Sequence, residues 1–331
     1  MRSVAFFSSS IVFLGLSACG GAPSEGVGST TVAEQALTSE PSTIYNGPVS
    51  AIAQDDKYIF LGAATDMDHT TGGIIRVDRA NPSNQVTIAD GSNPDVYPGS
   101  IALDDSYVYY SDTFAGTVKR VPKSGGSTTV IANQQTEPRS VFVDSKNLYF
   151  ATSAEVKRVA KGGGTPTTIA WHQESANDVV ADSKYVYWAT YHTVARAPIA
   201  GGASVTIART DGAIPAIAID SSSVYFVDNP SYGLVGSIRS VPKIGGKVTT
   251  VATNQSIPMD LAVDGSYVYW ANSALTDYYT NAGSVVRWTK GSSPVTIADK
   301  QWGPLLVTAR GSSVVWVNVG ETGSGTVVAV H

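Results

Sequence analysis

The sequence predicts an all-β fold, a seven-bladed β-propeller, and three observations support this. The chain has 331 residues with 43% apolar and 15% charged side chains and a single cysteine, which is typical of a large globular protein without a disulfide framework. Apolar and polar residues alternate with a period of two in many short segments, and no segment has a convincing helical stripe. A pattern of roughly 40 residues recurs seven times, and four-stranded repeats of this length form propeller blades.

Each copy of the repeat is predicted to form four strands. The first landmark is an aspartate that ends the innermost strand, found at Asp55, Asp104, Asp144, Asp182, Asp220 and Asp264, with Arg310 in the seventh place, at spacings of 49, 40, 38, 38, 44 and 46 residues. In the second copy the four strands are expected at 101–103, 107–110, 117–121 and 129–132. Paired glycines before four outer strands supply the positive φ of a two-residue hairpin, at Gly125-Gly126, Gly163-Gly164, Gly201-Gly202 and Gly245-Gly246.

The two ends of the chain are predicted to close the ring. The seventh copy reaches His331 after its third strand, and residues 42–46, Ser-Thr-Ile-Tyr-Asn, match the outer strand that it lacks. An N-terminal strand in that position leaves no partial sheet exposed. We therefore expect one propeller domain over residues 42–331, and a ring of six or eight blades would require that one copy had been misread.

The N-terminal residues have the pattern of a secretory signal peptide at 1–18. Arg2 precedes an apolar stretch, and Leu16-Ser-Ala-Cys19 resembles the bacterial lipobox; the resemblance implies cleavage before Cys19 and lipidation of its thiol. The alternative is an ordinary signal peptide cut near Ala18 that leaves a free thiol. Residues 19–41 are rich in small and polar residues, as expected of a lipidated cysteine followed by a flexible tether. Gly20, by resemblance to enterobacterial sorting, favours the outer membrane or cell surface of the envelope.

The repeat also resembles known propeller families. Residues 108–112, Val-Tyr-Tyr-Ser-Asp, and residues 116–126, Gly-x-Val-x-Arg-Val-Pro-Lys-x-Gly-Gly, resemble the YWTD repeat of lipoprotein-receptor propellers and, more loosely, NHL-type and virginiamycin-lyase-like propellers. The resemblance covers the whole domain. It implies the propeller fold and a tendency to bind proteins or glycans on one face.

Charge excludes two classes of partner. The formal net charge is −5 and no cluster of Lys and Arg interrupts the chain, so neither nucleic acid nor an anionic membrane surface is an expected partner. Contact with the membrane is expected through the lipid anchor alone, and the protein is expected to be a monomer.

Loops that depart from the repeat are the candidate binding residues, because a rigid frame leaves recognition to variable loops. The loops between second and third strands are long at 64–73, 227–236 and 272–283 and of moderate length at 318–325, and these should form a wall on one side of the top face. Aromatic rings beside polar groups suit a glycan, a peptide or an envelope protein. The candidate ligand-binding residues are Tyr232, Asp277, Tyr278, Tyr279, Trp171, Trp302, Arg139 and Arg209.

Metal-binding and catalytic candidates are fewer. Asp178 and Asp260, four residues before their blade aspartates, are expected near the central channel, where they either hold Ca²⁺ or Mg²⁺ or are solvated or bonded to serine. Asp66 and Asp68 resemble the start of a calcium loop, with Thr71 in place of the sharp-turn glycine. His172 and His192 fall in neighbouring top-face loops and suit a transition-metal ligand or a general base.

Two functions remain open on the sequence alone. The first is a lipid-anchored recognition or scaffold module that binds a glycan, peptide or partner protein through its top face. The alternative is a lyase or hydrolase that uses a divalent cation to act on polysaccharide or cyclic-peptide bonds in the same cleft. No common catalytic motif such as Gly-x-Ser-x-Gly or His-Glu-x-x-His is present.

Overall fold

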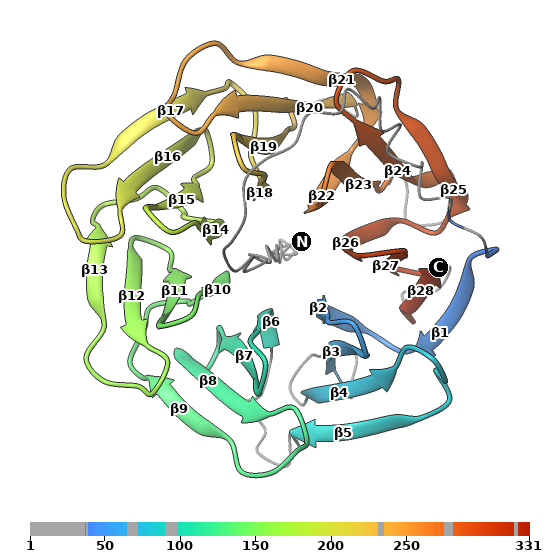
Figure 1. The fold of residues 1–331 in the computed structure, drawn as a ribbon, viewed down its shortest axis with the longest axis horizontal. Helices are drawn as coiled ribbons and strands as arrows, with labels where there is room; N and C mark the ends of the chain where they lie inside the picture. Colours follow the sequence, from blue (N-terminus) through green and yellow to red (C-terminus); the bar gives the residue numbers. More distant parts are fainter. Residues whose placement is uncertain are drawn as a thin grey trace, which may run out of the picture.

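The structure is a computed structural model that describes residues 37, 39–64, 72–89, 98–230, 235–274, 281–320 and 324–331. These residues form 28 strands in seven four-stranded antiparallel sheets, arranged as blades around a central axis (Figure 1). The described residues contain no helix, and hence none that is long and apolar enough to cross a membrane. The predicted all-β, seven-bladed propeller is confirmed.

Each blade contributes one strand to each radial position. The innermost strands are β2 (Val49–Gln54), β6 (Pro98–Leu103), β10 (Val141–Val143), β14 (Asp178–Ala181), β18 (Ile217–Ile219), β22 (Pro258–Asp264) and β26 (Pro304–Arg310). The second strands are β3 (Tyr58–Ala64), β7 (Tyr107–Asp112), β11 (Asn147–Ala151), β15 (Tyr185–Ala189), β19 (Ser223–Asp228), β23 (Tyr267–Asn272) and β27 (Ser313–Asn318).

The outer half of each blade completes the sheet. The third strands are β4 (Gly72–Asp78), β8 (Thr117–Pro122), β12 (Val156–Ala160), β16 (Thr193–Pro198), β20 (Val235–Pro242), β24 (Gly283–Thr289) and β28 (Thr326–Val330). The outer strands are β5 (Gln85–Ala89), β9 (Thr129–Ala132), β13 (Thr167–Ala170), β17 (Val205–Arg209), β21 (Thr249–Ser256), β25 (Val295–Gln301) and β1 (Ser42–Asn46).

The N-terminal strand closes the ring, as predicted. β1 pairs antiparallel with β28, with Ser42 opposite Ala329, and so completes the seventh blade. The residues just before β1 also contact the propeller: the Ser39 amide donates to the His331 carbonyl at 3.0 Å. Residues 39–46 and the C-terminal strand are therefore held within one blade.

Large aromatic side chains fill the spaces between blades. Trp188, Trp270, Trp316, Tyr110, Phe150 and Phe226 occupy the same position of the second strand and are each at most 1% exposed. The prediction that they pack the core is confirmed. Burying each ring stabilises the fold by about 1.5–3 kcal/mol. Each buried Trp Nε1 still needs an acceptor, and Trp188, for example, donates to Gln173 Oε1 at 2.8 Å.

The repeated aspartate shapes the turn between the first and second strands. Asp104 Oδ1 accepts the backbone N–H groups of Ser106 and Tyr107 at 2.9 and 2.8 Å, while its Oδ2 accepts the Tyr109 hydroxyl at 2.9 Å. Aspartate is favoured in such turns because its side chain replaces a backbone acceptor. The tyrosine contact recurs at Asp144, Asp182 and Asp220.

The paired glycines have positive φ as predicted, but they do not form the centre of the hairpin. The Gly125 amide donates to the Pro122 carbonyl at 2.8 Å, so the turn consists of residues 122–125, and Gly125 and Gly126 follow its centre with φ of 89° and 133°. The same bond recurs in three other blades. Glycine is required here because the chain leaves the turn through the left-handed region.

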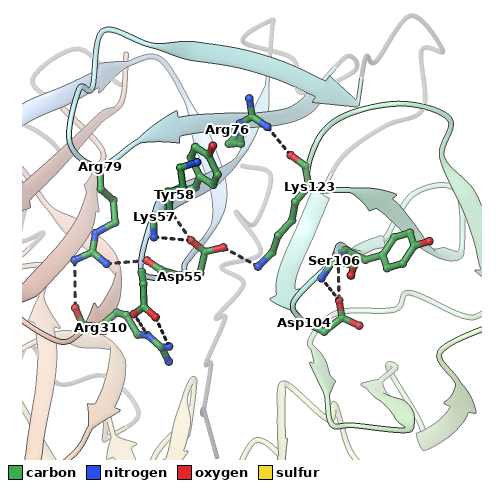
Figure 2. Close-up of polar contacts among 11 residues, drawn as sticks. Asp55, Lys57, Tyr58, Arg76, Arg79, Asp104, Ser106, Lys123 and Arg310 are labelled. Carbon is green, nitrogen blue, oxygen red and sulfur yellow. Dashed lines mark hydrogen bonds and ion pairs between the residues drawn. The ribbon is translucent and has the colours of Figure 1, made fainter. Parts of the chain in front are cut away.

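Ion pairs join neighbouring blades near these aspartates. Lys123 of the second blade contacts Asp55 of the first at 2.6 Å (Figure 2), and Lys161 contacts Asp104 in the same way. The seventh blade has Arg310 in place of aspartate, and there the polarity is reversed: Arg310 Nε donates to Asp56 Oδ1 of the first blade at 2.7 Å. The blade contact that closes the ring therefore has its own ion pair.

Candidate functional site

The two faces of the ring are built from different connections. The turns described above form the bottom face, while the loops between second and third strands and the crossovers to the next blade form the top face. The loops between second and third strands comprise residues 65–71, 229–234, 273–282 and 319–325 in blades one, five, six and seven. In blades two to four they comprise only residues 113–116, 152–155 and 190–192. The predicted difference in loop length is confirmed.

Most residues of the predicted wall lie outside the described residues. The wall residues outside the described ranges are Asp66, Asp68, Tyr232, Asp277, Tyr278 and Tyr279. The predicted lipidation site, Cys19, also lies outside them. Their roles stay predictions. The loops on the opposite, low side of the top face, in blades two to four, are all described.

The low side of the top face is one continuous arc of loops, which we call the top-face arc: residues 113–116, 133–140, 152–155, 171–177, 190–192 and 209–216. Backbone hydrogen bonds join consecutive loops, with N···O distances of 2.8–3.4 Å: Gln135 to Gly116, Ser153 to Thr136, Gln173 to Ala154, Tyr191 to Glu174 and Ile214 to Tyr191. Loops tied to each other and to the blades below them lose little conformational entropy when a partner binds.

Three large aromatic side chains project from the top-face arc. Phe114 is 73% exposed, Trp171 is 64% exposed and Tyr191 is 46% exposed. They come from blade two, from the crossover between blades three and four, and from blade four. The sequence identified Trp171 but missed the other two. Their signal was a bulky aromatic residue in a very short loop, Thr113-Phe114 and Thr190-Tyr191, where no core position is available.

His192 is held in one tautomer. Its Nδ1 lies 3.0 Å from the Gly212 carbonyl oxygen, and because a carbonyl can only accept, Nδ1 carries the proton of the neutral ring. The Nε2 lone pair is therefore left as an acceptor. The Tyr191 ring lies nearly perpendicular to the imidazole, with centroids 4.6 Å apart, so the two rings are in contact.

His172 is exposed and belongs to a recurring turn. Its φ is 55°, and the next residue, Gln173, accepts the Trp188 indole N–H. Equivalent positive-φ residues precede the glutamines of three other crossovers: Gln134, Asn254 and Lys300. The backbone at His172 thus positions Gln173, while its imidazole is exposed on the top-face arc.

The predicted ligand-binding residues that the structure describes are not brought together. Arg139 lies in the crossover to blade three. It donates to Glu137 Oε2 of the same crossover at 3.0 Å and to Asn177 Oδ1 of the crossover to blade four at 3.2 Å. Arg209 is exposed at the end of β17, and Trp302 is partly buried in the crossover to blade seven. Trp171 and the two arginines belong to the top-face arc, whereas Trp302 lies beyond it.

Asp178 and Asp260 join blades. Asp178 Oδ1 accepts the Ser140 hydroxyl at 2.7 Å and Oδ2 accepts the Ile217 amide of the next blade at 2.9 Å. Asp260 Oδ2 likewise accepts the Val307 amide at 2.9 Å. Both carboxylates are fully buried. A bond to serine was one of the predicted alternatives, and the structure shows it for Asp178, with Ser140 as the donor.

Within the described ranges, no group of three or more His, Cys, Asp and Glu side chains is arranged to hold a metal ion. The Ca²⁺ or Mg²⁺ suggested for Asp178 and Asp260 stays a prediction. A carboxylate that already accepts two or more protein hydrogen bonds is a less available ligand.

Comparison with known proteins identifies the fold. No protein-family model matches the chain, and no curated protein matches its sequence. Among solved structures, a streptogramin B lyase superposes with a TM-score of 0.69 at 11% identity, over 88% of this chain and 98% of that chain. The WD40 β-propeller domain of Doa1 gives 0.66 at 13% identity, over 88% and 97%. The nidogen/laminin complex gives 0.57 at 17%, over 76% and 97%. These similarities show a seven-bladed propeller and, at such identities, the fold alone.

Proposed function

We propose that this protein is a recognition module that binds a protein partner through the top-face arc. The observation that carries the proposal is the exposure of Phe114, Trp171 and Tyr191 on loops tied together by hydrogen bonds. Exposed aromatic anchors on a rigid surface are typical of the centres of protein interfaces, where Trp, Tyr and Arg contribute most of the binding energy.

The distribution of these side chains favours a macromolecular partner over a small ligand. The three rings span three consecutive blades rather than lining one pocket. Two arginines, Arg139 and Arg209, belong to the same arc. One structural neighbour, nidogen, was solved in complex with the protein laminin.

The test places a photo-reactive amino acid at Phe114 or Tyr191, with Ile244 as the matched control. Ile244 is 80% exposed but lies in a bottom-face turn. We expect both top-face positions to cross-link to the same envelope protein, and the control position to give none of it. The purified partner should then bind the Trp171→Ala variant at least tenfold more weakly, and Ile244→Ala with unchanged affinity.

Equal cross-linking at Ile244, or unchanged affinity in Trp171→Ala, would show that the arc is not the binding surface. A glycan array provides the other arm. Binding to a glycan that depends on Trp171 would replace the protein partner with a carbohydrate.

A second candidate is a lyase or hydrolase, favoured by the fixed tautomer of His192 and by the structural similarity to streptogramin B lyase. His192 Nε2 would act as general base beside Tyr191. Incubation with a cyclic streptogramin B and mass spectrometry of the products tests this. Ring opening that disappears in His192→Ala supports the enzyme, and an intact substrate with the unmodified protein rejects it for this substrate.

We also propose that Cys19 anchors the protein to the cell envelope through lipid, at the outer membrane or cell surface. The support is the sequence Leu16-Ser-Ala-Cys19. Metabolic labelling with a fatty-acid analogue should label the unmodified protein but not Cys19→Ser, which should also leave the membrane fraction. Membrane retention of unlabelled Cys19→Ser would overturn the assignment.

A further inference from the structure

A turn closed by a glutamine side chain recurs in four crossovers of the top face. The residue before the glutamine has a positive φ of 53–56° in all four. The glutamine Nε2 donates to the carbonyl oxygen two residues earlier, so the side chain holds the first residue of the turn. These bonds run from Gln135 to Asn133, from Gln173 to Trp171, from Gln255 to Thr253 and from Gln301 to Asp299.

The Gln173 side chain connects the surface with the core. Its Nε2 donates to the Trp171 carbonyl at 2.7 Å, and its Oε1 accepts the indole N–H of the fully buried Trp188 at 2.8 Å. The Gln173 backbone N–H donates to the Ala154 carbonyl of blade three at 2.8 Å. Gln173 is therefore fixed at three atoms, and one planar amide links the buried Trp188 to the backbone of the exposed Trp171.

The residue that the glutamine holds differs among the four turns. Three of them carry a polar side chain there, Asn133, Thr253 or Asp299. The crossover from blade three to blade four instead carries Trp171, which is 64% exposed. The backbone of Trp171 is held on both sides, because Ala170 pairs with Val156 at the end of β13 and the Trp171 carbonyl accepts from Gln173. A ring on a fixed backbone loses less conformational entropy when a partner covers it.

We propose that Gln173 is a positioning residue for recognition of the partner protein, because it holds Trp171 in place for binding. This inference rests on the proposed function, in which Trp171 is a binding residue of the top-face arc. The bond from Trp188 fixes the orientation of the Gln173 amide, and the amide fixes the Trp171 carbonyl. Loss of either bond should leave the exposed ring more mobile, although neither bond involves an atom of that ring.

Two variants separate the two ends of the amide. Gln173→Glu keeps an oxygen for the Trp188 indole N–H but has no N–H to donate to the Trp171 carbonyl. Trp188→Phe removes the bond at the other end. The fold already accepts phenylalanine at this position, since Phe150 and Phe226 occupy it in blades three and five.

Fluorine NMR of the full-length protein labelled with fluorotryptophan measures the mobility of Trp171 without any partner. The chain has six tryptophans, and the Trp171 signal is the one that Trp171→Phe removes. We expect this signal to become narrower and to move toward its position in the unfolded chain, both in Gln173→Glu and in Trp188→Phe. The matched control is Gln255→Glu, which makes the same change in the turn that carries Thr253 and should leave the signal unchanged. An unchanged signal in Gln173→Glu, or an equal change in the control, would overturn the proposal; if Gln173→Glu does not fold, the signal in Trp188→Phe decides.

A double-mutant cycle tests the role of Gln173 in binding, with the envelope protein cross-linked at Phe114 as the probe. Gln173→Glu should weaken its binding by about two- to tenfold, because a mobile side chain must be ordered when the partner binds. In a Trp171→Ala background the same change should have no further effect, since there is then no ring to position. An equal loss in both backgrounds would show that Gln173 does not act through Trp171. If no envelope protein is captured, the proposed function fails, and the NMR measurement alone decides whether Gln173 positions Trp171.

Discussion

At the scale of single residues, the position four before the blade aspartate joins one blade to the next wherever it holds Ser or Asp. Ser100 Oγ accepts the Val141 amide at 3.1 Å, and Ser140 Oγ accepts the Val179 amide at 3.2 Å. Asp178 and Asp260 occupy the same position and make the equivalent bond with a carboxylate. A buried carboxylate that accepts backbone N–H groups is both strongly bound and costly to remove.

Asp178→Ala should therefore lower the free energy of unfolding by about 2–5 kcal/mol, since it leaves the Ile217 amide and the Ser140 hydroxyl without this acceptor. Urea unfolding measures the change. The exposed Asp105 provides the control, and Asp105→Ala should shift stability by less than about 0.5 kcal/mol. A melting temperature that rises with Ca²⁺ only when Asp178 is present would instead assign this residue to a cation.

The positions of the buried carboxylates could be predicted from the sequence, but their hydrogen-bond partners could not. The repeat located Asp178 and Asp260 at one position of the innermost strand. Their acceptor role depends on amides at Ile217 and Val307, which approach only when two blades pack. Phe114 and Tyr191 were missed for a related reason. They lie in short loops whose sequences differ from blade to blade, so comparison of the repeats does not indicate whether their side chains are exposed.

At the scale of strands and turns, ion pairs between blades differ in how far they are removed from water. The Lys161 and Asp104 side chains are 24% and 16% exposed, whereas Asp56, which pairs with Arg310 at the closure of the ring, is 81% exposed. Exposed pairs contribute about 0–1 kcal/mol because water and salt screen them. Partly buried pairs cost more to break, since one charge is left behind.

Lys161→Met should accordingly cost about 1–3 kcal/mol, whereas Asp56→Ala should cost less than about 1 kcal/mol. Methionine keeps most of the lysine stem, so the variant reports mainly on the charge. Urea unfolding at low and at high salt gives both values. A larger loss of stability in Asp56→Ala than in Lys161→Met would show that the pair between Arg310 and Asp56 contributes more. High salt should then lower the free energy of unfolding of the unmodified protein.

The elements themselves were largely predictable. Strand β9 begins and ends where the repeat predicted it, and β1 completes the seventh blade as expected. The repeat carried this information because the same kinds of residue pack at the same positions of every blade. Comparing seven copies shows which positions are common to all blades. The hairpin was the exception: paired glycines suggested a two-residue turn, but the turn begins at Pro122 and the glycines follow its centre.

At the scale of the whole molecule, the repeated aspartate–tyrosine contacts make stability depend on pH in two directions. Burial alone would raise the pKa of Asp104, but hydrogen bonds from Lys161 and from the turn amides outweigh it, and its pKa is lowered. The pKa values of Asp55, Asp182 and Asp220 are lowered in a similar way. Burial, reinforced by the adjacent aspartate, raises the pKa of Tyr109, Tyr149, Tyr187 and Tyr225.

The signs follow from proton binding in the two states. An aspartate with a lowered pKa in the folded state stabilises the fold above its unfolded value of about 3.9, and this contribution is lost as pH falls through the folded pKa. A tyrosine with a raised pKa keeps its proton when the unfolded chain loses it, so stability falls once pH rises above about 10. The free energy of unfolding should therefore have a plateau between about pH 5 and 9, with a fall on each side.

Urea midpoints measured from pH 3 to pH 11 test this shape, and Tyr149→Phe isolates the alkaline side. Phenylalanine fills the same buried position but has no ionisable hydroxyl, so the variant should be less stable than the unmodified protein at pH 7, where the bond to Asp144 is missing. Its stability should then decrease less between pH 9 and pH 11. Because lysines also lose charge in this range, the difference between the two proteins, rather than either slope alone, reports the tyrosine. Parallel slopes would show that the contact between Tyr149 and Asp144 has no role in the alkaline loss of stability.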